Sequence, residues 1–212
     1  VLITTKSGKS GKTEVSYNGF VSFDRLGKKL DLLGVEDYVK YQYEFQLLRG
    51  NQSSFANLFG GNINDADFYT GAYSRIAQEY GNRAGIDWQD EVFNYDAPVQ
   101  QHQLSINGGN DKMTYFLSLG YFNQEGIVGG NYGRSNYERL SVRSNSTYKV
   151  FEVEDRKYLN AVTVGVNLGY TRDHSTSVEA NSEYGSILGS AIAFSPLVPV
   201  YASEEEGESI LA

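Results

Sequence analysis

The sequence predicts an all-β chain that contributes about five strands to a transmembrane antiparallel β-barrel, with helical insertions in its long connections. From Val99 to Arg172, long stretches alternate hydrophobic and polar residues, and side chains on a strand point to opposite faces with a period of two. The connections alternate between long and short, as in outer-membrane barrels, where one rim carries tight turns and the other longer loops. We therefore expect lipid against one face, and water or a plug against the other.

The chain opens on two expected strands. Val1–Lys6 is a short apolar strand, and Ser7–Lys12 is a polar, flexible link. The second strand, Thr13–Phe23, alternates strictly, and Phe20 is the one large apolar residue on its polar face. Its apolar face carries Val15, Tyr17, Gly19, Val21 and Phe23.

The next seventy or so residues have helical periodicity. Val35–Arg49 is predicted to be a helix that stops at Gly50. Asp65–Tyr80 follows the i, i+3, i+4 rule more closely, and Gly81 provides its stop. Gly50–Asn64, rich in Asn and Gly, is expected to be the loop between them. Asp24–Pro98 as a whole is therefore expected to be one long extracellular loop.

Four more strands are expected after this loop. They are Val99–Asn107, Met113–Gln124, Tyr137–Val150 and Leu159–Arg172, with a tight turn at Gly108–Asp111 and a link at Phe151–Lys157. The last strand is the clearest, with Val162, Val164, Val166, Leu168 and Tyr170 on one face. Beyond Asp173 the alternation ends, and Ser182–Ala193 is a possible helix.

The cations of the strand Tyr137–Val150 test the assignment of faces. Arg139, Arg143 and Lys149 all fall on the polar face, opposite to Leu140 and Val142. On a lipid face, each would cost about 2–4 kcal/mol at the membrane midplane. The pattern therefore assigns all three to the lumen.

Composition excludes several function classes. The formal net charge is −8 and no Lys/Arg cluster stands out, which argues against a nucleic-acid partner. There is no cysteine, so disulfide frameworks and Cys-ligated metals are excluded. The chain starts on Val1-Leu2-Ile3 without an initiator Met, and we interpret it as an internal segment of a longer protein.

Motifs for catalysis are also missing, so we expect no enzyme and no cofactor. The two histidines, His102 and His174, have no second histidine at metal-ligand spacing. Oxygen ligands for Ca²⁺ could come from a loop that contains Asn62, Asn64, Asp65 and Asp67, but the spacing does not fit an EF-hand, and a helix-capping loop is the alternative.

Aromatic residues are abundant, with 17 Tyr and 11 Phe. Several fall on apolar strand faces near the strand ends, where an interfacial girdle would lie: Tyr17, Phe23, Tyr115, Tyr121, Tyr148 and Tyr170. The loop aromatics are candidates for contact with a substrate or partner through stacking, or for packing the loop itself: Tyr69, Tyr73, Trp88 and Phe194.

Several segments resemble the SusC/RagA-like TonB-dependent transporters of the Bacteroidetes outer membrane. Val1–Gly8 (VLITTKSG) is similar to the end of their plug domain, and Val15–Gly19 (VSYNG) to their first barrel strand. Asp87–Phe93 (DWQDEVF) resembles the segment that enters the second strand. The most specific stretches are Leu104–Gly109 (LSINGG) and Tyr115–Gly126 (YFLSLGYFNQEG).

This resemblance implies a 22-stranded barrel, with residues 1–8 ending the plug, 9–12 as a link and 13–212 as the first part of the barrel. It implies import of large nutrients, glycans or oligopeptides, across the bacterial outer membrane. The implied partners are a SusD-like surface lipoprotein, outer-membrane lipid, and TonB through a part of the chain not present here. The alternative from a different class is a soluble all-β carbohydrate-binding or adhesion module with a helical insertion.

Overall fold

The computed structural model describes residues 6–51, 53, 62, 64–66, 70–153, 157–179 and 185–201 of the 212. The chain divides into two compact units. One comprises Val1–Gly27 and Phe93–Glu179, and the other comprises Lys28–Val92 and Ala180–Ala212. We refer to them as the sheet unit and the helical unit.

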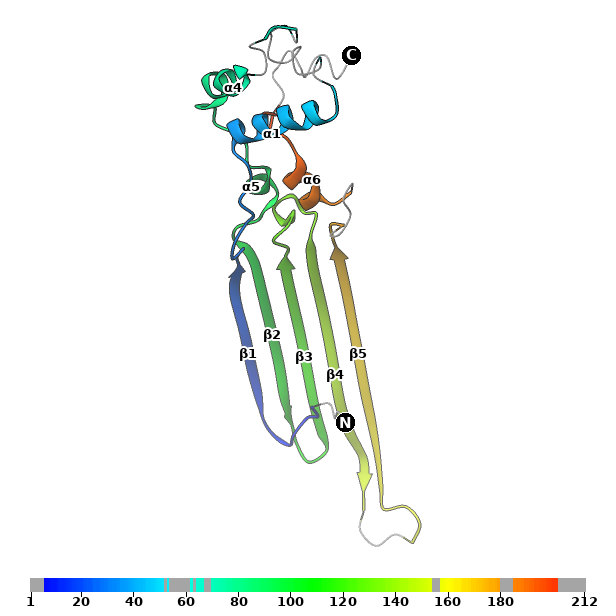
Figure 1. Cartoon of the computed structure of the whole chain (residues 1–212). Helices are drawn as coiled ribbons and strands as arrows, with labels where there is room; N and C mark the ends of the chain where they lie inside the picture. Colours follow the sequence, from blue (N-terminus) through cyan, green and yellow to red (C-terminus); the bar gives the residue numbers. More distant parts are fainter. Residues whose placement is uncertain are drawn as a thin grey trace, which may run out of the picture. The chain divides into compact units, whose positions relative to one another are not determined.

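The sheet unit is one antiparallel sheet of five long strands in the order β1-β2-β3-β4-β5 (Figure 1). The strands are β1 (Gly11–Asp24), β2 (Ala97–Gly109), β3 (Met113–Glu125), β4 (Asn136–Glu152) and β5 (Ala161–Thr176). Each strand pairs with its neighbour in sequence, as successive hairpins do. The edge strands β1 and β5 do not pair with each other, so the sheet is open. The prediction of five antiparallel strands is confirmed.

The register confirms the predicted faces. Residues directly opposite in an antiparallel pair share a face, and Tyr17 is joined in this way through Leu104, Leu119 and Val142 to Tyr170. One face therefore collects most of the large apolar side chains of the sheet: Val15, Tyr17, Val21, Phe23, Leu104, Ile106, Tyr115, Leu117, Leu119, Tyr121, Leu140, Val142, Tyr148, Val162, Val164, Val166, Leu168 and Tyr170.

This apolar band is slanted across the strands. In β1 it runs from Val15 to Phe23, and in β5 from Val162 to Tyr170. Tyr170, the last apolar residue of the band in β5, lies in the same row as Tyr17 of β1, and the band continues in β1 for six more residues to Phe23. At the opposite edge, Val15, the first residue of the band in β1, lies in the same row as Leu168, and the band in β5 begins six residues earlier, at Val162. The band thus shifts by six residues between the two edge strands.

The strand ends differ from the predictions at two places. A register shift between Lys149 and Phe151 makes Val150 the extra residue of a β-bulge, and Phe151 pairs with Val162. Phe151 therefore takes the place on the apolar face that the alternation gives to Val150, and the predicted link starting at Phe151 is wrong. In β5, the strand begins at Ala161 and continues to Thr176, because β4 offers it partners as far as Asn136. A short 3₁₀ helix, Gly130–Tyr132, lies in the loop before β4.

The helical unit contains α1 (Val35–Leu48), α4 (Ala72–Tyr80), α5 (Trp88–Val92) and α6 (Ile187–Ala193). Helix α1 confirms the first predicted helix. Helix α4 confirms the C-terminal part of the second predicted helix, whereas Asp65 lies in a turn and residues 67–69 lie outside the described part. Helix α6 begins after Ser186, whose Oγ accepts a hydrogen bond from the Gly189 amide, and residues 182–184 lie outside the described part.

The core of the helical unit lies between α1 and α4. It consists of Val35, Val39, Tyr43, Ala72, Ile76 and Tyr80, all of them buried. These positions recur every four residues on each helix, which gives each helix an apolar stripe facing the other. Among the described residues, no helix is long and apolar enough to cross a membrane.

The expected strand Val1–Lys6 lies outside the described residues except for Lys6, which is not in a strand. The expected link from Ser7 is shorter than predicted, because β1 already begins at Gly11.

Candidate functional site

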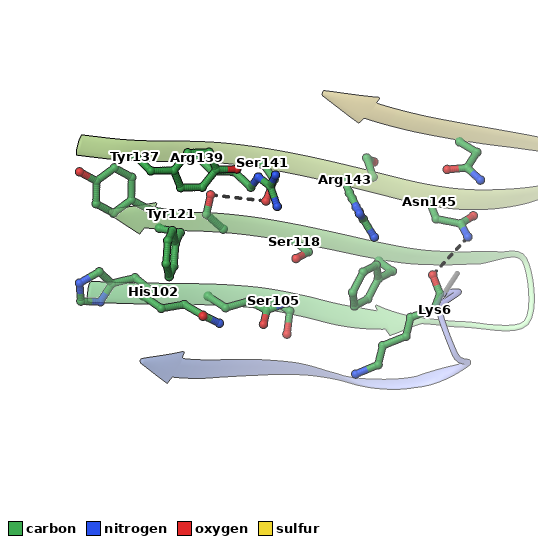
Figure 2. A pocket seen from close by; sticks show the side chains of 17 residues that line it. Lys6, His102, Ser105, Ser118, Tyr121, Tyr137, Arg139, Ser141, Arg143 and Asn145 are labelled. Carbon is green, nitrogen blue, oxygen red and sulfur yellow. Dashed lines mark hydrogen bonds between the residues drawn. The ribbon is translucent and has the colours of Figure 1, made fainter. Parts of the chain in front are cut away.

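The polar face of the sheet carries a hollow of about 670 Å³. Figure 2 shows the side chains around it, which come from β2, β3, β4 and β5 and from Lys6. Most belong to the polar face by register: Gln101, Gln103, Ser105, Phe116, Ser118, Gly120, Phe122, Tyr137, Arg139, Ser141, Arg143, Asn145 and Asn167. Small and amide-bearing side chains dominate, so the surface can take up water or a polar chain.

The three predicted lumen cations share this face but differ in their partners. Arg139 Nε lies 2.6 Å from Asp173 Oδ1, which also accepts a 3.0 Å hydrogen bond from the Tyr137 hydroxyl. Lys149 Nζ pairs with Glu152 Oε2 at 3.0 Å, away from the hollow. Arg143 lines the hollow and has no ion pair or hydrogen bond with the described residues. Of the three predicted lumen cations, Arg143 is therefore the one without a partner among the described residues.

The apolar face carries a stack of three rings around His102. The Tyr17 hydroxyl lies 2.6 Å from His102 Nδ1, and the two rings are stacked at 6.1 Å. Tyr121 stacks on the other side of His102, at 6.4 Å. This polar pair explains how a histidine is accommodated on an otherwise apolar face.

In the helical unit, Trp88 and Phe194 come together although 106 residues separate them in the sequence. Their rings meet edge to face with centroids 4.9 Å apart, and Trp88 Nε1 donates a 3.1 Å hydrogen bond to the Ser195 carbonyl. The Ile86 amide donates to the Pro196 carbonyl at 3.0 Å. The segment around Trp88 is therefore attached to the segment around Phe194 by both backbone and side-chain contacts.

These two aromatics belong to a pocket of about 720 Å³ within the helical unit. Its walls also include the aromatic side chains Tyr38, Tyr41 and Phe45 of α1, with Arg83 from the segment after α4. Rings of this kind can stack on a sugar or on a peptide side chain. The structure thus brings together Trp88 and Phe194 of the four predicted loop aromatics.

The other two predicted loop aromatics have different outcomes. Tyr73, on α4, packs edge to face on Tyr43 at 5.9 Å and donates a hydrogen bond to Glu44 on α1. This hydrogen bond raises the pKa of Tyr73 above its usual value. Its ring contributes to the packing of α1 against α4. Tyr69 lies outside the described residues.

Helix α5 and its anchor were not predicted from the sequence. Gln89 is buried, and its side-chain amide exchanges two hydrogen bonds with the Leu30 backbone, at 2.9 and 3.0 Å. The Asp87 side chain accepts a hydrogen bond from the Gln89 amide at 3.0 Å, as a helix N-cap does. An Asp before a short acidic segment is a capping signal, but five residues are too few for a helical period to show.

An ionic cluster supports the same helix. Lys29 Nζ lies 2.7 Å from Asp87 Oδ2 and 2.7 Å from Asp90 Oδ1. Partial burial by itself would raise the pKa of Asp87, but the hydrogen bonds from Lys29 and Gln89 outweigh it and hold that pKa below its usual range. The bonds to Asp87 and Asp90 raise the pKa of Lys29 in turn. Asp87 and Lys29 are therefore both charged at neutral pH.

The loop considered for Ca²⁺ is only partly described. Asn62 Oδ1 accepts hydrogen bonds from the Asn64 amide at 3.0 Å and from its side chain at 3.2 Å, which makes Asn62 part of a turn. Asp67 lies outside the described residues. The described part of the chain contains no group of three or more His, Cys, Asp or Glu residues that could hold a metal ion.

No family model matches the chain. It is similar to the TonB-dependent receptor SusC of Bacteroides thetaiotaomicron, with 32% identity over 206 residues, 97% of this chain and 16% of that protein. The TonB-dependent receptor P3 of Formosa agariphila is 25% identical over 209 residues, 96% of this chain and 17% of that protein. The chain therefore spans about one sixth of the length of these curated relatives.

Two solved structures share the fold. The RagAB peptide importer in its closed-closed state aligns with 91% of this chain and 21% of its own, at a TM-score of 0.56 and 22% identity. The RagAB peptide transporter aligns with 82% of this chain and 19% of its own, at a TM-score of 0.54 and 24% identity. The similarity to SusC along nearly the whole chain confirms the resemblance predicted from the sequence, and the two solved structures show the shared fold.

Proposed function

We propose that this chain, which matches one segment of SusC-like TonB-dependent receptors along nearly its whole length, forms part of the wall of a transmembrane β-barrel. The barrel spans the bacterial outer membrane, and the five strands are its first five, out of the 22 that the resemblance implies. The open edges of the sheet suit this role, because closure of a barrel requires partner strands for β1 and β5.

The slanted apolar band is the observation that carries this proposal. A lipid layer is flat, so its edges cross tilted strands at positions that shift from one strand to the next. The six-residue shift corresponds to about 20 Å along the strands, and four strand spacings are about 19 Å. The strands would then tilt by about 45° from the membrane normal. Outer-membrane barrels have tilts of about 35–45°.

The exposure of this band favours a membrane over a soluble module. On the edge strand β1, Val21 is 61% exposed, and Val15 and Tyr17 are each 65% exposed. On the other edge strand, β5, Leu168 is 63% exposed. A soluble β-sandwich would cover such a face with a second sheet. Contiguous apolar surface of this extent marks contact with another protein or with lipid.

The function proposed for the whole receptor is TonB-dependent import of large nutrients, glycans or oligopeptides, without enzymatic activity. The lumen wall would be the polar face, where Arg143 has no ion-pair partner among the described residues. Trp88 and Phe194 would contribute to substrate or partner contact, together with a SusD-like surface lipoprotein. What supports this is the aromatic lining of their pocket and the sequence similarity to SusC. Loops on a rigid scaffold are common places for binding.

Topology provides the direct test. The loop between β1 and β2 should face the outside of the cell, and the tight turn between β2 and β3 the periplasm. A single cysteine at Asn82 should react with a membrane-impermeant maleimide in whole cells, and one at Asp111 should react only after cell lysis. Equal reaction at both sites, or a full-length protein that fractionates without detergent as a soluble monomer, would contradict the proposal and favour the soluble module.

A further inference from the structure

The N-terminal segment Lys6–Lys9 lies across the polar face of the sheet. At one end, the Lys9 amide donates a 3.1 Å hydrogen bond to Asn107 Oδ1 of β2. At the other end, Asn145 Nδ2 of β4 donates a 3.3 Å hydrogen bond to the Lys6 carbonyl, the dashed line at the right of Figure 2. Two asparagine side chains therefore bind the backbone of one segment from strands that are not neighbours.

The register places the two asparagines that make these contacts in the same row of the sheet. Asn107 pairs with Phe116 of β3, and Phe116 pairs with Asn145, so the three residues form one row on the polar face. Two strand spacings amount to about 10 Å, the length that three residues of extended chain can span. Lys6 and Lys9 are three residues apart, so an extended segment fits between the two amides without slack.

Gly8 allows the segment to approach the sheet closely in the middle of this crossing. A Cβ atom at Gly8 would lie 2.3 Å from the backbone nitrogen of Tyr115 and 2.6 Å from its carbonyl carbon. The obstacle is strand backbone, which cannot move aside as a flexible side chain would. Any larger residue at this position would lift the segment away from β3.

We propose that Asn107 and Asn145 form a clamp that holds the backbone of Lys6–Lys9 against the polar face. The clamp recognises extended backbone, because it uses one amide oxygen and one amide nitrogen and no side chain of the segment. It fixes the point where the preceding part of the chain meets the sheet. If the sheet is a barrel wall, which is the proposed function, the clamp holds this preceding part against the inside of the barrel.

The mobility of the segment tests the clamp. A nitroxide attached to a cysteine at Ser7 in the purified full-length protein should give an immobilised spectrum. In N107A/N145A, each lost hydrogen bond should shift the ratio of released to bound segment about fivefold, so the mobile component should rise more than tenfold. The single variants, N107A and N145A, should give intermediate ratios.

Asn167 supplies the matched control. It lies opposite Asn145 on β5 and lines the same hollow, but it makes no hydrogen bond with the described residues. N167A should leave the spectrum unchanged, and Gly8→Ala should mobilise the label without touching either asparagine. A mobile label in Gly8→Ala together with an immobilised label in N107A/N145A would overturn the clamp. The same holds if N167A mobilises the label as much as the double variant does.

These measurements do not depend on transport, so failure of the clamp and failure of the proposed function can be told apart. A second readout addresses the membrane consequence. Cells that express N107A/N145A should become more sensitive to a large hydrophilic antibiotic such as vancomycin than cells that express N167A. Equal sensitivity, with a mobile label, would overturn the role inside a barrel and leave the clamp itself supported.

Discussion

The sheet unit and the helical unit place their apolar side chains in opposite environments. In the helical unit, Val39 and Ile76 are 1% and 2% exposed, and the two helices bury one apolar stripe between them. In the sheet unit, the large side chains of one face remain in contact with the surroundings. The sheet is held by backbone ladders along four strand pairs, which fix its register without a core on the apolar side.

The charges follow the same division. The helical unit carries six Lys/Arg and fifteen Asp/Glu, and the sheet unit carries twelve Lys/Arg and eleven Asp/Glu. The excess negative charge of the chain therefore belongs to the helical unit, which is packed as a water-soluble protein is. The comparison teaches that the two units of one chain treat apolar side chains differently: the helices bury them against each other, and the strands expose them on one face, as the proposed barrel wall requires.

The largest effect is expected from a charge on the apolar face. Val166 lies at the centre of the apolar stretch of β5, and Asn167 follows it on the polar face. V166R should cost about 2–4 kcal/mol if this position faces hydrocarbon, and should sharply reduce the heat-modifiable folded receptor in the outer membrane. N167R should assemble normally. Equal yields of folded V166R and N167R receptor would mean that the Val166 face does not contact hydrocarbon.

A truncation in the helical core is expected to have the next largest effect. I76A removes a buried side chain from between α1 and α4 and should destabilise the helical unit by about 2–5 kcal/mol. The matched variant L168A truncates a side chain that is 63% exposed, and should change little. Hydrogen exchange of α1 and α4 measures the difference. If α1 and α4 are equally protected from hydrogen exchange in I76A and in L168A, the buried Ile76 side chain does not stabilise the helical unit.

A smaller effect is expected at the anchor of α5. Q89A removes the two hydrogen bonds between the Gln89 side chain and the Leu30 backbone, at a cost of about 1–3 kcal/mol for the pair. Faster hydrogen exchange in residues 28–33 and 86–92 should report the loss. Gln78 on α4 is exposed, so Q78A is the control and should leave the same segments protected. Faster exchange of residues 28–33 and 86–92 in both Q89A and Q78A would mean that the whole helical unit is destabilised, and not the Gln89 contact alone.

The smallest effect is expected from pH. The pKa of Asp87 is lower in the folded state than in the unfolded chain, so its contribution to stability is complete above about pH 4 and is lost as the pH falls through the folded value. Exchange of residues 86–92, corrected for the intrinsic rate, should rise below about pH 4. D87N should show faster exchange at neutral pH and a flatter dependence in this range. A steep acid dependence that persists in D87N would assign it to another group.

The strand faces could be predicted because their signal is local. The alternation in β5 alone assigns Val162 to Tyr170 to one side, and the observed register only adds the neighbours. The single misassignment, Val150 against Phe151, comes from a β-bulge, which adds one residue without leaving a mark in the alternation. Helix α1 was predictable for the same reason, through its period of 3.6.

The candidate site was predictable only in part. The sequence places Arg139 and Arg143 on the polar face, but it does not indicate that Asp173 neutralises the first and leaves the second free. The sequence identifies Trp88 and Phe194 as loop aromatics but does not indicate that their rings are in contact. Helix α5 is too short for a periodic signal, and the buried Gln89 that anchors it is indistinguishable in sequence from an exposed one.

The sequence by itself determined which residues share a face, the number and sense of the strands, and the acidic character of the long connections. These follow from periodicity and composition, which act over a few residues. Only the tertiary structure decided the slant of the apolar band, the pairing of Trp88 with Phe194, and the crossing of Lys6–Lys9 over the row of Asn107 and Asn145. Each of these depends on contacts between residues about a hundred positions apart, and the free energy of such contacts comes from geometry that no local pattern specifies.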